Sequence, residues 1–122
     1  MIAITSGAVG ERIIAYFILI LGIRDDDAQR YLKLNLPLDA ATDCTLAPSV
    51  ADEYQSQGLG SVLMRQLIVL SRQLGRRRMV LWGGTQATND RAIRFYHKHG
   101  FRTVGEFQEP LGFNNYDMIM DL

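Results

Sequence analysis

Residues 54–67, YQSQGLGSVLMRQL, place two glycines directly before apolar residues at helical spacing. A helix start presents backbone N–H groups without intrahelical partners, at the positive end of the helix dipole. Gly58 and Gly60 let a bulky anion approach these groups closely, which would offset the conformational cost of glycine there. The segment therefore predicts a phosphate-binding loop, with a tight strand-to-helix turn as the alternative.

Two common phosphate-binding motifs do not fit this segment. It lacks the Gly-Lys-Ser/Thr ending of a P-loop. Gln55 stands where a dinucleotide-binding fingerprint has glycine. A different kind of phosphate site is therefore expected.

The composition is that of one globular domain spanning residues 1–122, with 48% hydrophobic and 21% charged residues. The formal net charge is zero, which argues against nucleic acid or an anionic membrane as a partner. The single cysteine, Cys44, excludes an internal disulfide and fits a reducing, cytoplasmic environment. Because His97, His99 and Cys44 are the only soft metal ligands, we expect no metal site.

The apolar segment 13–23 is shorter than the ~20 residues that a membrane-spanning helix needs. It has no basic leader, and RDDD follows it where a signal peptide has small residues. Its β-branched and aromatic content predicts a strand buried on both faces.

Hydrophobic periodicity and turn residues divide the rest of the chain. Helical spacing predicts helices over 59–74 and 90–99, each stopped by a glycine, and Asn89 or Thr88 caps the second. The charged segment 24–30 reads as a solvated loop or one helical turn. Strands are predicted over 1–5, 12–23, 31–38, 44–50, 78–85, 101–107 and 116–122. This order predicts an α/β fold, a mixed sheet flanked by helices.

Two separated motifs carry the most specific signal. The first is Q-x-x-G-x-G, formed by Gln55, Gly58 and Gly60. The second is N-x-x-A-x-x-x-Y, formed by Asn89, Ala92 and Tyr96 and followed closely by Gly100 and Phe101. In this order and at this separation they resemble the signature of the GNAT superfamily of N-acetyltransferases, and the resemblance runs from about Arg12 to the C-terminus.

The resemblance implies the GNAT fold, with a mostly antiparallel central sheet, and acetyl-CoA as co-substrate. In that family the glycine loop holds the cofactor pyrophosphate. The strand before the loop and the strand after the helix splay apart to admit the pantetheine arm. The cofactor-binding residues implied here are Val50, Gln55, Ser56, Gln57, Gly58, Leu59, Gly60, Ser61, Asn89, Ala92 and Tyr96.

Two features of the flanking strands suit such a gap. Pro48 cannot donate a hydrogen bond, so it belongs at a bulge or in an unpaired strand segment. Gly83 and Gly84 would weaken a strand interior where a ligand lies close, or they simply end the strand early.

Tyr96 matches the family tyrosine that donates to the departing CoA thiolate, which makes it the predicted catalytic acid. A phenol of pKa about 10 suits a thiolate of similar basicity. The alternative is a half-buried tyrosine that only packs with Phe95 and Phe101. Asn89 matches a residue that contacts the pantetheine arm, and it can also be an ordinary helix N-cap.

The general base stays unassigned. Many family members carry a glutamate about where Cys44 lies, and the neighbouring Asp43 should face the other side of the strand. His97 and His99 are expected in solvent. A nucleophilic Cys44 has no His/Asp partner evident in the sequence, so a core position is the alternative.

Residues 76–78 and Trp82 each allow two interpretations. Residues 76–78, three arginines, would contact the 3′-phosphate of CoA or form a solvated run at a helix end. Trp82 is expected in the core rather than on a surface that stacks with the acceptor.

Most family members have an extra strand and two helices before the segment that matches residues 11–20. Because this chain starts too late to contain them in full, we expect an N-terminally shortened fold and an acceptor site that is incomplete or shared with a partner chain. A homodimer is compatible with the family's frequent dimers.

The leading hypothesis is direct transfer of an acetyl group from acetyl-CoA to the primary amine of a small molecule or peptide. The alternative is a catalytically silent acyl-CoA-binding module with a regulatory role. A third reading, binding of another phosphorylated ligand, leaves the motif from Asn89 to Tyr96 unexplained.

Overall fold

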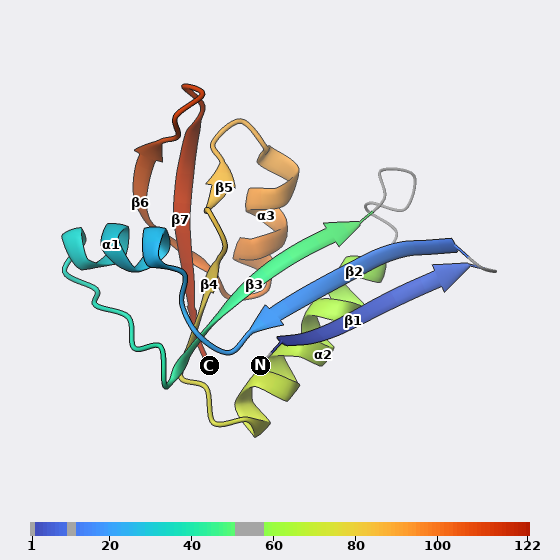
Figure 1. The fold of residues 1–122 in the computed structure, drawn as a ribbon. Helices are drawn as coiled ribbons and strands as arrows, with labels where there is room; N and C mark the ends of the chain where they lie inside the picture. The colour runs from blue at the N-terminus through green and yellow to red at the C-terminus, as the bar shows by residue number, and fades with distance from the viewer. Residues whose placement is uncertain (1, 10–11, 51–57) are drawn as a thin grey trace.

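The computed structural model describes residues 2–9, 12–50 and 58–122, and the side chains of residues 16–47 and 58–122. In this part of the chain seven strands form one sheet, in the order β1-β2-β3-β4-β7-β5, with β6 also paired to β7. The strands are β1 (Ile2–Val9), β2 (Arg12–Ile20), β3 (Asp43–Val50), β4 (Arg78–Leu81), β5 (Thr85–Gln86), β6 (Arg102–Gln108) and β7 (Asn114–Asp121); the helices are α1 (Asp25–Lys33), α2 (Leu59–Gln73) and α3 (Asp90–Lys98). Among the strands that the structure describes, only β3 and β4 pair in parallel (Figure 1). The predicted mixed, mostly antiparallel sheet flanked by helices is confirmed.

The first two strands form a hairpin, and β2 also pairs with β3. The strand predicted over 1–5 extends to Val9, and the one predicted over 12–23 ends at Ile20. The prediction that β2 is buried on both faces is wrong. Phe17 and Leu19 are fully buried against α2, whereas Tyr16 on the opposite face is 43% exposed. The apolar run therefore forms a strand with one face in the core.

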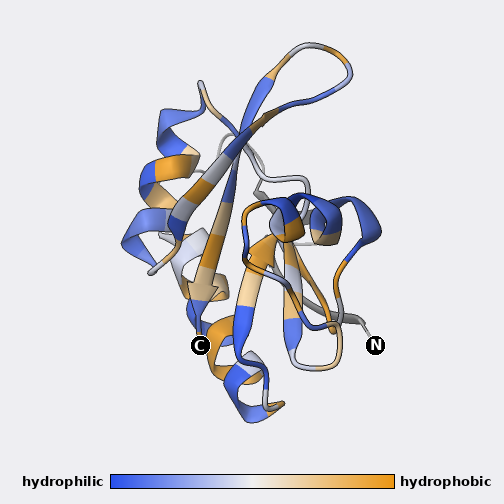
Figure 2. Cartoon of the chain, turned by 90° about the vertical axis from the view of Figure 1, so that its left-hand side faces the viewer, coloured by the Kyte–Doolittle hydropathy of each residue, from blue (hydrophilic) through white to orange (hydrophobic). Residues whose placement is uncertain are grey.

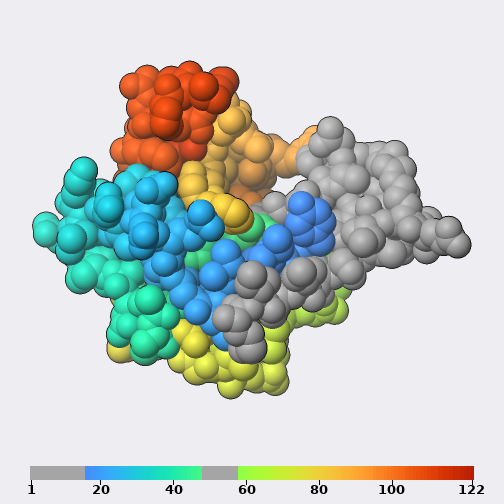
Figure 3. All heavy atoms as spheres, viewed as in Figure 1, coloured from blue at the N-terminus to red at the C-terminus, as the bar shows by residue number. Residues whose placement is uncertain are grey.

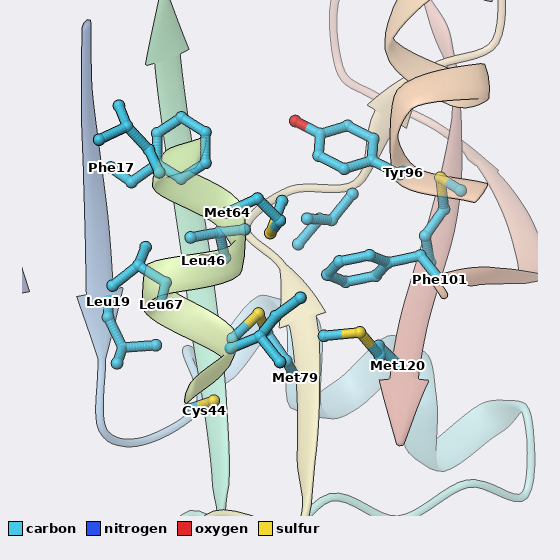
Figure 4. Packing of buried hydrophobic residues seen from close by; sticks show 14 residues of the cluster. Phe17, Leu19, Cys44, Leu46, Met64, Leu67, Met79, Tyr96, Phe101 and Met120 are labelled. Atoms are coloured by element: carbon cyan, nitrogen blue, oxygen red, sulfur yellow. The ribbon is translucent and has the colours of Figure 1, made fainter. Parts of the chain in front are cut away.

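The predicted helix after the glycine loop is α2, which packs one apolar face on the sheet. Its buried side chains recur at helical spacing: Ser61, Leu63, Met64, Leu67, Ile68 and Ser71. Figure 4 shows Met64 and Leu67 packed against Phe17 and Leu19 of β2. Gly75, with a φ of 75°, follows the helix as its left-handed stop, as predicted. No helix in the described residues is long and apolar enough to cross a bilayer.

The charged segment after β2 folds differently from the prediction. Asp25–Lys33 form the helix α1, where we expected a solvated loop or one turn, followed by a strand over 31–38. Three aspartates in its first turn and two basic residues in its last complement the helix dipole. The helix stops at Asn35, whose φ of 58° goes with the two backbone hydrogen bonds of a Schellman turn. The alternating leucines that predicted a strand therefore span a helix end and the loop after it.

A second, smaller core lies on the face of the sheet opposite α2 and α3. Val80 and Ile119 point to this face, while their neighbours Met79 and Met118 belong to the core beneath α2. Tyr31 of α1 is fully buried against the first pair, and its hydroxyl donates to the Met118 carbonyl at 3.0 Å. The ribbon of α1 is mostly hydrophilic in colour (Figure 2). One buried tyrosine and polar bonds, rather than an apolar stripe, hold this helix.

The strand β4 is shorter than the strand predicted over 78–85. A turn follows it, in which the Gly84 N–H donates to the Leu81 carbonyl at 3.2 Å and Gly83 has a φ of 67°. A Cβ on Gly84 would lie 2.5 Å from the Tyr116 carbonyl oxygen, so only glycine lets β7 approach this closely. The alternative reading of the two glycines, an early strand end, is therefore correct.

Candidate functional site

The parallel strands β3 and β4 run side by side only in part. Their register pairing ends at Leu46 opposite Leu81, and the Trp82 N–H donates to the Leu46 carbonyl at 3.0 Å. Beyond that bond β3 continues to Val50, paired with β2, while the chain after β4 turns away. Figure 1 shows the carboxyl ends of the two strands diverging. This divergence agrees with the splayed strands that the family resemblance implied.

Pro48 occupies the edge of β3 that faces the gap. The backbone polar groups of Leu46 point towards β4, and because strand residues alternate, those of Pro48 point the same way. Pro48 lies opposite Phe17 of β2 without a register shift, so of the two expected settings, a bulge or an unpaired segment, the bulge is absent. The missing N–H therefore falls on the side that β4 has left, where no ladder bond is lost.

The start of α2 lies beyond the end of β3 and is built to face an anion. Gly58, its N-cap, has a φ of 83° and no side chain with which to bind the N–H groups of the first turn. The first turn contains no carboxylate, whereas α1 and α3 both begin with aspartate. The N–H groups of Leu59, Gly60 and Ser61 precede the first intrahelical bond, from the Val62 N–H to the Gly58 carbonyl. An anion here would meet N–H groups that have no backbone acceptor among the described residues, and a favourable dipole.

The third part of the site is the start of α3. Asn89 is its N-cap, and its Oδ1 accepts a hydrogen bond from the Ala92 N–H at 3.1 Å. The N-cap reading of Asn89 is therefore correct, and contact of Asn89 and Ala92 with a pantetheine arm stays a prediction.

Tyr96 lies on the inner face of α3. Its ring packs edge to face with Phe95 and Phe101, at centroid distances of 5.4 and 5.6 Å. Figure 4 shows its hydroxyl directed across the core towards Phe17, on the side where β3 runs. Burial raises the pKa of the phenol above its ordinary value, so Tyr96 keeps its proton. Tyr96 can therefore both pack in the core and donate a hydrogen bond from its hydroxyl.

Cys44 is fully buried beneath α2 and donates from Sγ to the Arg78 carbonyl at 3.5 Å. Burial raises the pKa of its thiol to about 11, which suppresses the thiolate that a nucleophile needs. Cys44 is therefore a core residue. Asp43 points the other way, as predicted, and is ion-paired with Arg78 at 2.8 Å.

The two histidines of α3 differ. His97 is exposed, as expected, and its Nε2 lies 3.2 Å from the Thr103 hydroxyl. His99 was expected in solvent, but it is half-buried, and its Nε2 lies 3.0 Å from Ser61 Oγ at the start of α2. Because 38 residues separate the two partners, no local pattern in the sequence could have indicated this contact.

A cluster of buried charges lies on the opposite face, beside the turn after β4. Asp27 of α1 and Asp117 of β7 both bind the guanidinium of Arg30, whose Nε is 3.0 Å from Asp117 Oδ2. Asp27 Oδ1 also accepts from the Gly83 N–H at 3.1 Å, which ties α1 to the turn. The sequence reading missed this cluster because it treated residues 24–30 as solvated; the spacing of Asp27 and Arg30 was its one local signal.

Two other predictions need correction. Trp82 is 46% exposed rather than in the core, because β4 ends before it, and the Arg24 guanidinium stacks 4.3 Å from its ring centroid. The turn that carries it reaches the surface beside the residues that follow β2 (Figure 3).

The arginine run is solvated only in part, since Arg77 is exposed whereas Arg76 and Arg78 are half-buried, and its contact with the 3′-phosphate of CoA stays a prediction. It follows α2, and a 15-residue helix is about 22 Å long, so the run lies far from Gly58. Arg76 donates to the Ala41 carbonyl at 2.6 Å, and Arg78 pairs with Asp43. Both arginines anchor the loop before β3.

The remaining predicted cofactor residues have these positions. Val50 is the last residue of β3, at the gap. Gln55, Ser56 and Gln57 lie outside the described residues. In the described part of the chain, no three His, Cys, Asp or Glu side chains gather as metal ligands would.

Comparisons with known proteins agree with this geometry. Residues 46–101 match the family model described as Acetyltransferase (GNAT) family. A GNAT-family acetyltransferase from Streptococcus pneumoniae has a TM-score of 0.74 and 20% identity, covering 94% of this chain and 63% of its own. The yncA protein of Salmonella typhimurium, solved with its cofactor acetyl-CoA, has a TM-score of 0.72 and 22% identity, covering 98% and 64%. No curated protein sequence matches the chain significantly.

The resemblance read from the two motifs is thereby confirmed: residues 46–101 carry the GNAT family signature, and the chain has the GNAT fold. A third similar structure, the ribosomal-protein-S18-alanine N-acetyltransferase of Escherichia coli, has a TM-score of 0.69 and 21% identity, covering 98% of this chain and 68% of its own. The chain spans 61% of the length of a GCN5-related N-acetyltransferase from Kribbella flavida, which has a TM-score of 0.68 and 19% identity over 90% of this chain. At these identities the fold is what the proteins share.

Proposed function

We propose that this protein is an N-acetyltransferase that transfers an acetyl group from acetyl-CoA directly to a primary amine. The observation that carries the proposal is the gap between β3 and β4, which opens where α2 begins with an uncapped, carboxylate-free turn. A strand edge and a helix start at one place suit a ligand that combines an amide-containing arm with a pyrophosphate. The matched family and the acetyl-CoA bound to yncA support this choice of ligand.

The cofactor would be held mainly by backbone. The N–H groups of Leu59, Gly60 and Ser61 would bind the pyrophosphate, joined by the predicted residues Gln55, Ser56, Gln57 and Gly58. The edge of β3 up to Val50 would pair with the pantetheine arm, with Asn89 and Ala92 of α3 beside it. Acetyl-CoA supplies the activated thioester.

Tyr96 would act on the leaving sulfur. Its raised pKa makes it a poor donor of a whole proton but keeps its O–H intact at every physiological pH. A hydrogen bond from this O–H to the developing thiolate stabilises negative charge in a buried site, where such a bond is stronger than in water.

The proposal extends to the compartment, the acceptor and the assembly of the protein. The free thiol of Cys44 suits a cytoplasmic location, and the acceptor would be a small molecule or peptide bearing an amine. We propose a homodimer as the assembly, which sedimentation equilibrium would test.

A second candidate function is an acyl-CoA-binding module without catalysis. It is favoured by one observation: Cys44, a protonated core thiol, stands where many family members carry a glutamate. Release of free thiol from acetyl-CoA upon addition of amines is expected only from an enzyme.

The first experiment is calorimetric titration with acetyl-CoA, with dephospho-CoA and ADP as controls. Saturable binding of acetyl-CoA, tighter than ADP, is the expected result, because ADP lacks the arm that would fill the gap. Equal affinity for ADP would favour a nucleotide site, and no binding by folded protein would refute the proposal. Screening amines for thiol release then separates the enzyme from the silent module.

A further inference from the structure

His99 joins two helices at the proposed phosphate site. It is the C-cap of α3, and its Nε2 lies 3.0 Å from the hydroxyl oxygen of Ser61, in the first turn of α2. The imidazole also packs edge to face against Phe95, with a ring centroid distance of 4.8 Å. Ser61 itself is buried, so its hydroxyl has few orientations available.

We propose that His99 is a positioning residue for the phosphates of the cofactor: it acts through Ser61 and takes up a proton when the cofactor binds. This inference rests on the proposed function, because it presumes that the pyrophosphate meets the first turn of α2. It concerns the regulation of that site by pH and assigns a role to a residue outside both sequence motifs.

The hydrogen-bond chemistry gives the reason. A serine hydroxyl has one hydrogen. If Ser61 donates to an unprotonated Nε2, that hydrogen is used and the anion receives none. If Nε2 carries a proton it donates to Ser61 Oγ, and the hydroxyl hydrogen turns to the anion. A fully protonated imidazole allows only the second arrangement, since both of its nitrogens are donors.

The charges around His99 favour the neutral ring until an anion arrives. Burial lowers its pKa, and so do the positive charges of Lys98 on its own helix and Arg65 on α2. A pyrophosphate at the same turn would counter both cations and favour the imidazolium. Binding therefore draws in a proton, and by linkage the affinity is highest below the lowered pKa and weakens as pH rises through the pKa of the bound form.

The chain offers a matched control in His97. This residue lies two positions earlier on α3, is exposed, and faces Thr103 rather than α2. The chain contains two histidines, so one variant of each assigns both imidazole signals in an NMR spectrum.

The test is the pH dependence of binding by wild type, His99→Gln, His99→Ala and His97→Gln. Dephospho-CoA is the ligand for the pH series, because its pyrophosphate does not titrate near neutrality whereas the 3′-phosphate of acetyl-CoA does. Calorimetry from about pH 5.5 to about pH 8 should show the wild-type Kd weakening about 3- to 10-fold as pH rises. NMR should show the imidazole pKa of His99 rising on addition of the ligand.

The variants separate positioning from a purely structural role. His99→Gln keeps a donor to Ser61 but cannot titrate, so it should bind with a flat pH profile. His99→Ala should bind more weakly at every pH, and His97→Gln should keep the wild-type slope. A flat wild-type profile, or a slope that survives in His99→Gln, would overturn the role of His99 while leaving the proposed function intact. Failure of wild type to bind acetyl-CoA at any pH would overturn both.

Discussion

The Trp82 N–H donates to the Leu46 carbonyl at 3.0 Å, at the point where the pairing of β3 with β4 ends. Two local features set this point. The turn closed by Gly84 onto Leu81 takes the chain away from β3, and Pro48 offers β4 no donor two residues further on. The gap is therefore encoded in the sequence of both strands and does not depend on a ligand to open it.

Gly58 should contribute to binding more than to stability. Gly58→Ala places a Cβ in open space, so its cost is the strain of a left-handed φ of 83°, about 1 kcal/mol. That strain should shift the first turn of α2 and weaken acetyl-CoA binding about tenfold or more, as measured by calorimetry. Gly112→Ala is the control, because Gly112 has a φ of 93° and the same open surroundings in the β6–β7 turn.

Both variants should lose similar stability in chemical denaturation, and only Gly58→Ala should lose affinity. Equal affinities for the two variants would mean that the start of α2 does not bind the cofactor.

The helices at the proposed cofactor site could be predicted from the sequence because each of their signals is local. The apolar stripe of α2, the Asn89 cap and the stops at Gly75 and Gly100 all act within a few residues, and both helices formed where predicted. The bond between His99 and Ser61 was not readable, since it depends on the packing of α3 against α2.

Tyr96 and Tyr31 provide a test of catalysis against structure. Tyr96→Phe leaves the packing with Phe95 and Phe101 in place, so the variant should fold and still bind acetyl-CoA. Loss of a hydrogen bond to a charged sulfur should slow thiol release about 10- to 100-fold, as measured with the best amine acceptor from the screen. Tyr31→Phe removes the bond to the Met118 carbonyl and should cost about 1 kcal/mol of stability without this loss of rate. An unchanged rate in Tyr96→Phe would leave Tyr96 a packing residue.

Cys44 should behave as a protected thiol. With its pKa raised to about 11 and its side chain fully buried, it should react with a disulfide reagent at neutral pH far more slowly than a free cysteine. Unfolding in denaturant should release one reactive thiol, which is the internal control. Cys44→Ala should retain transferase activity and lose about 1 kcal/mol of stability. Loss of activity in a stably folded Cys44→Ala protein would revive the nucleophile reading.

On the opposite face of the sheet, local sequence patterns did not predict the helix α1. Helix α1 has few apolar residues, and alternating leucines after it imitate a strand, so propensity and period both pointed away from the helix. What stabilises α1 is non-local: Tyr31 buried on β4 and β7, and Arg30 bonded to Asp117, 87 residues away. Such partners become visible only once the sheet has brought β7 beneath the helix.

Asp27 should make stability depend on pH in an uncommon direction. Burial is the dominant influence and raises its pKa above the usual 3.8, despite the opposing effects of the Gly83 N–H and Arg30. A carboxyl whose pKa is higher in the folded than in the unfolded state binds more protons when folded. The contribution of Asp27 to folding stability is therefore fully present below about pH 3.8. It is lost as the pH rises through the raised pKa of the folded state.

The Asp27→Asn variant removes this titration while its amide oxygen can still accept from the Gly83 N–H. We expect the free energy of unfolding of wild type, relative to Asp27→Asn, to fall in urea titrations as the pH rises above 3.8, the usual pKa of an aspartate. Asp121→Asn is the control, because Asp121 is 70% exposed in its pair with Arg102, and such surface pairs contribute little. If wild type instead gains stability over Asp27→Asn as pH rises, then attraction to Arg30 outweighs burial, and the cluster beside Gly83 holds Asp27 as a fully compensated carboxylate.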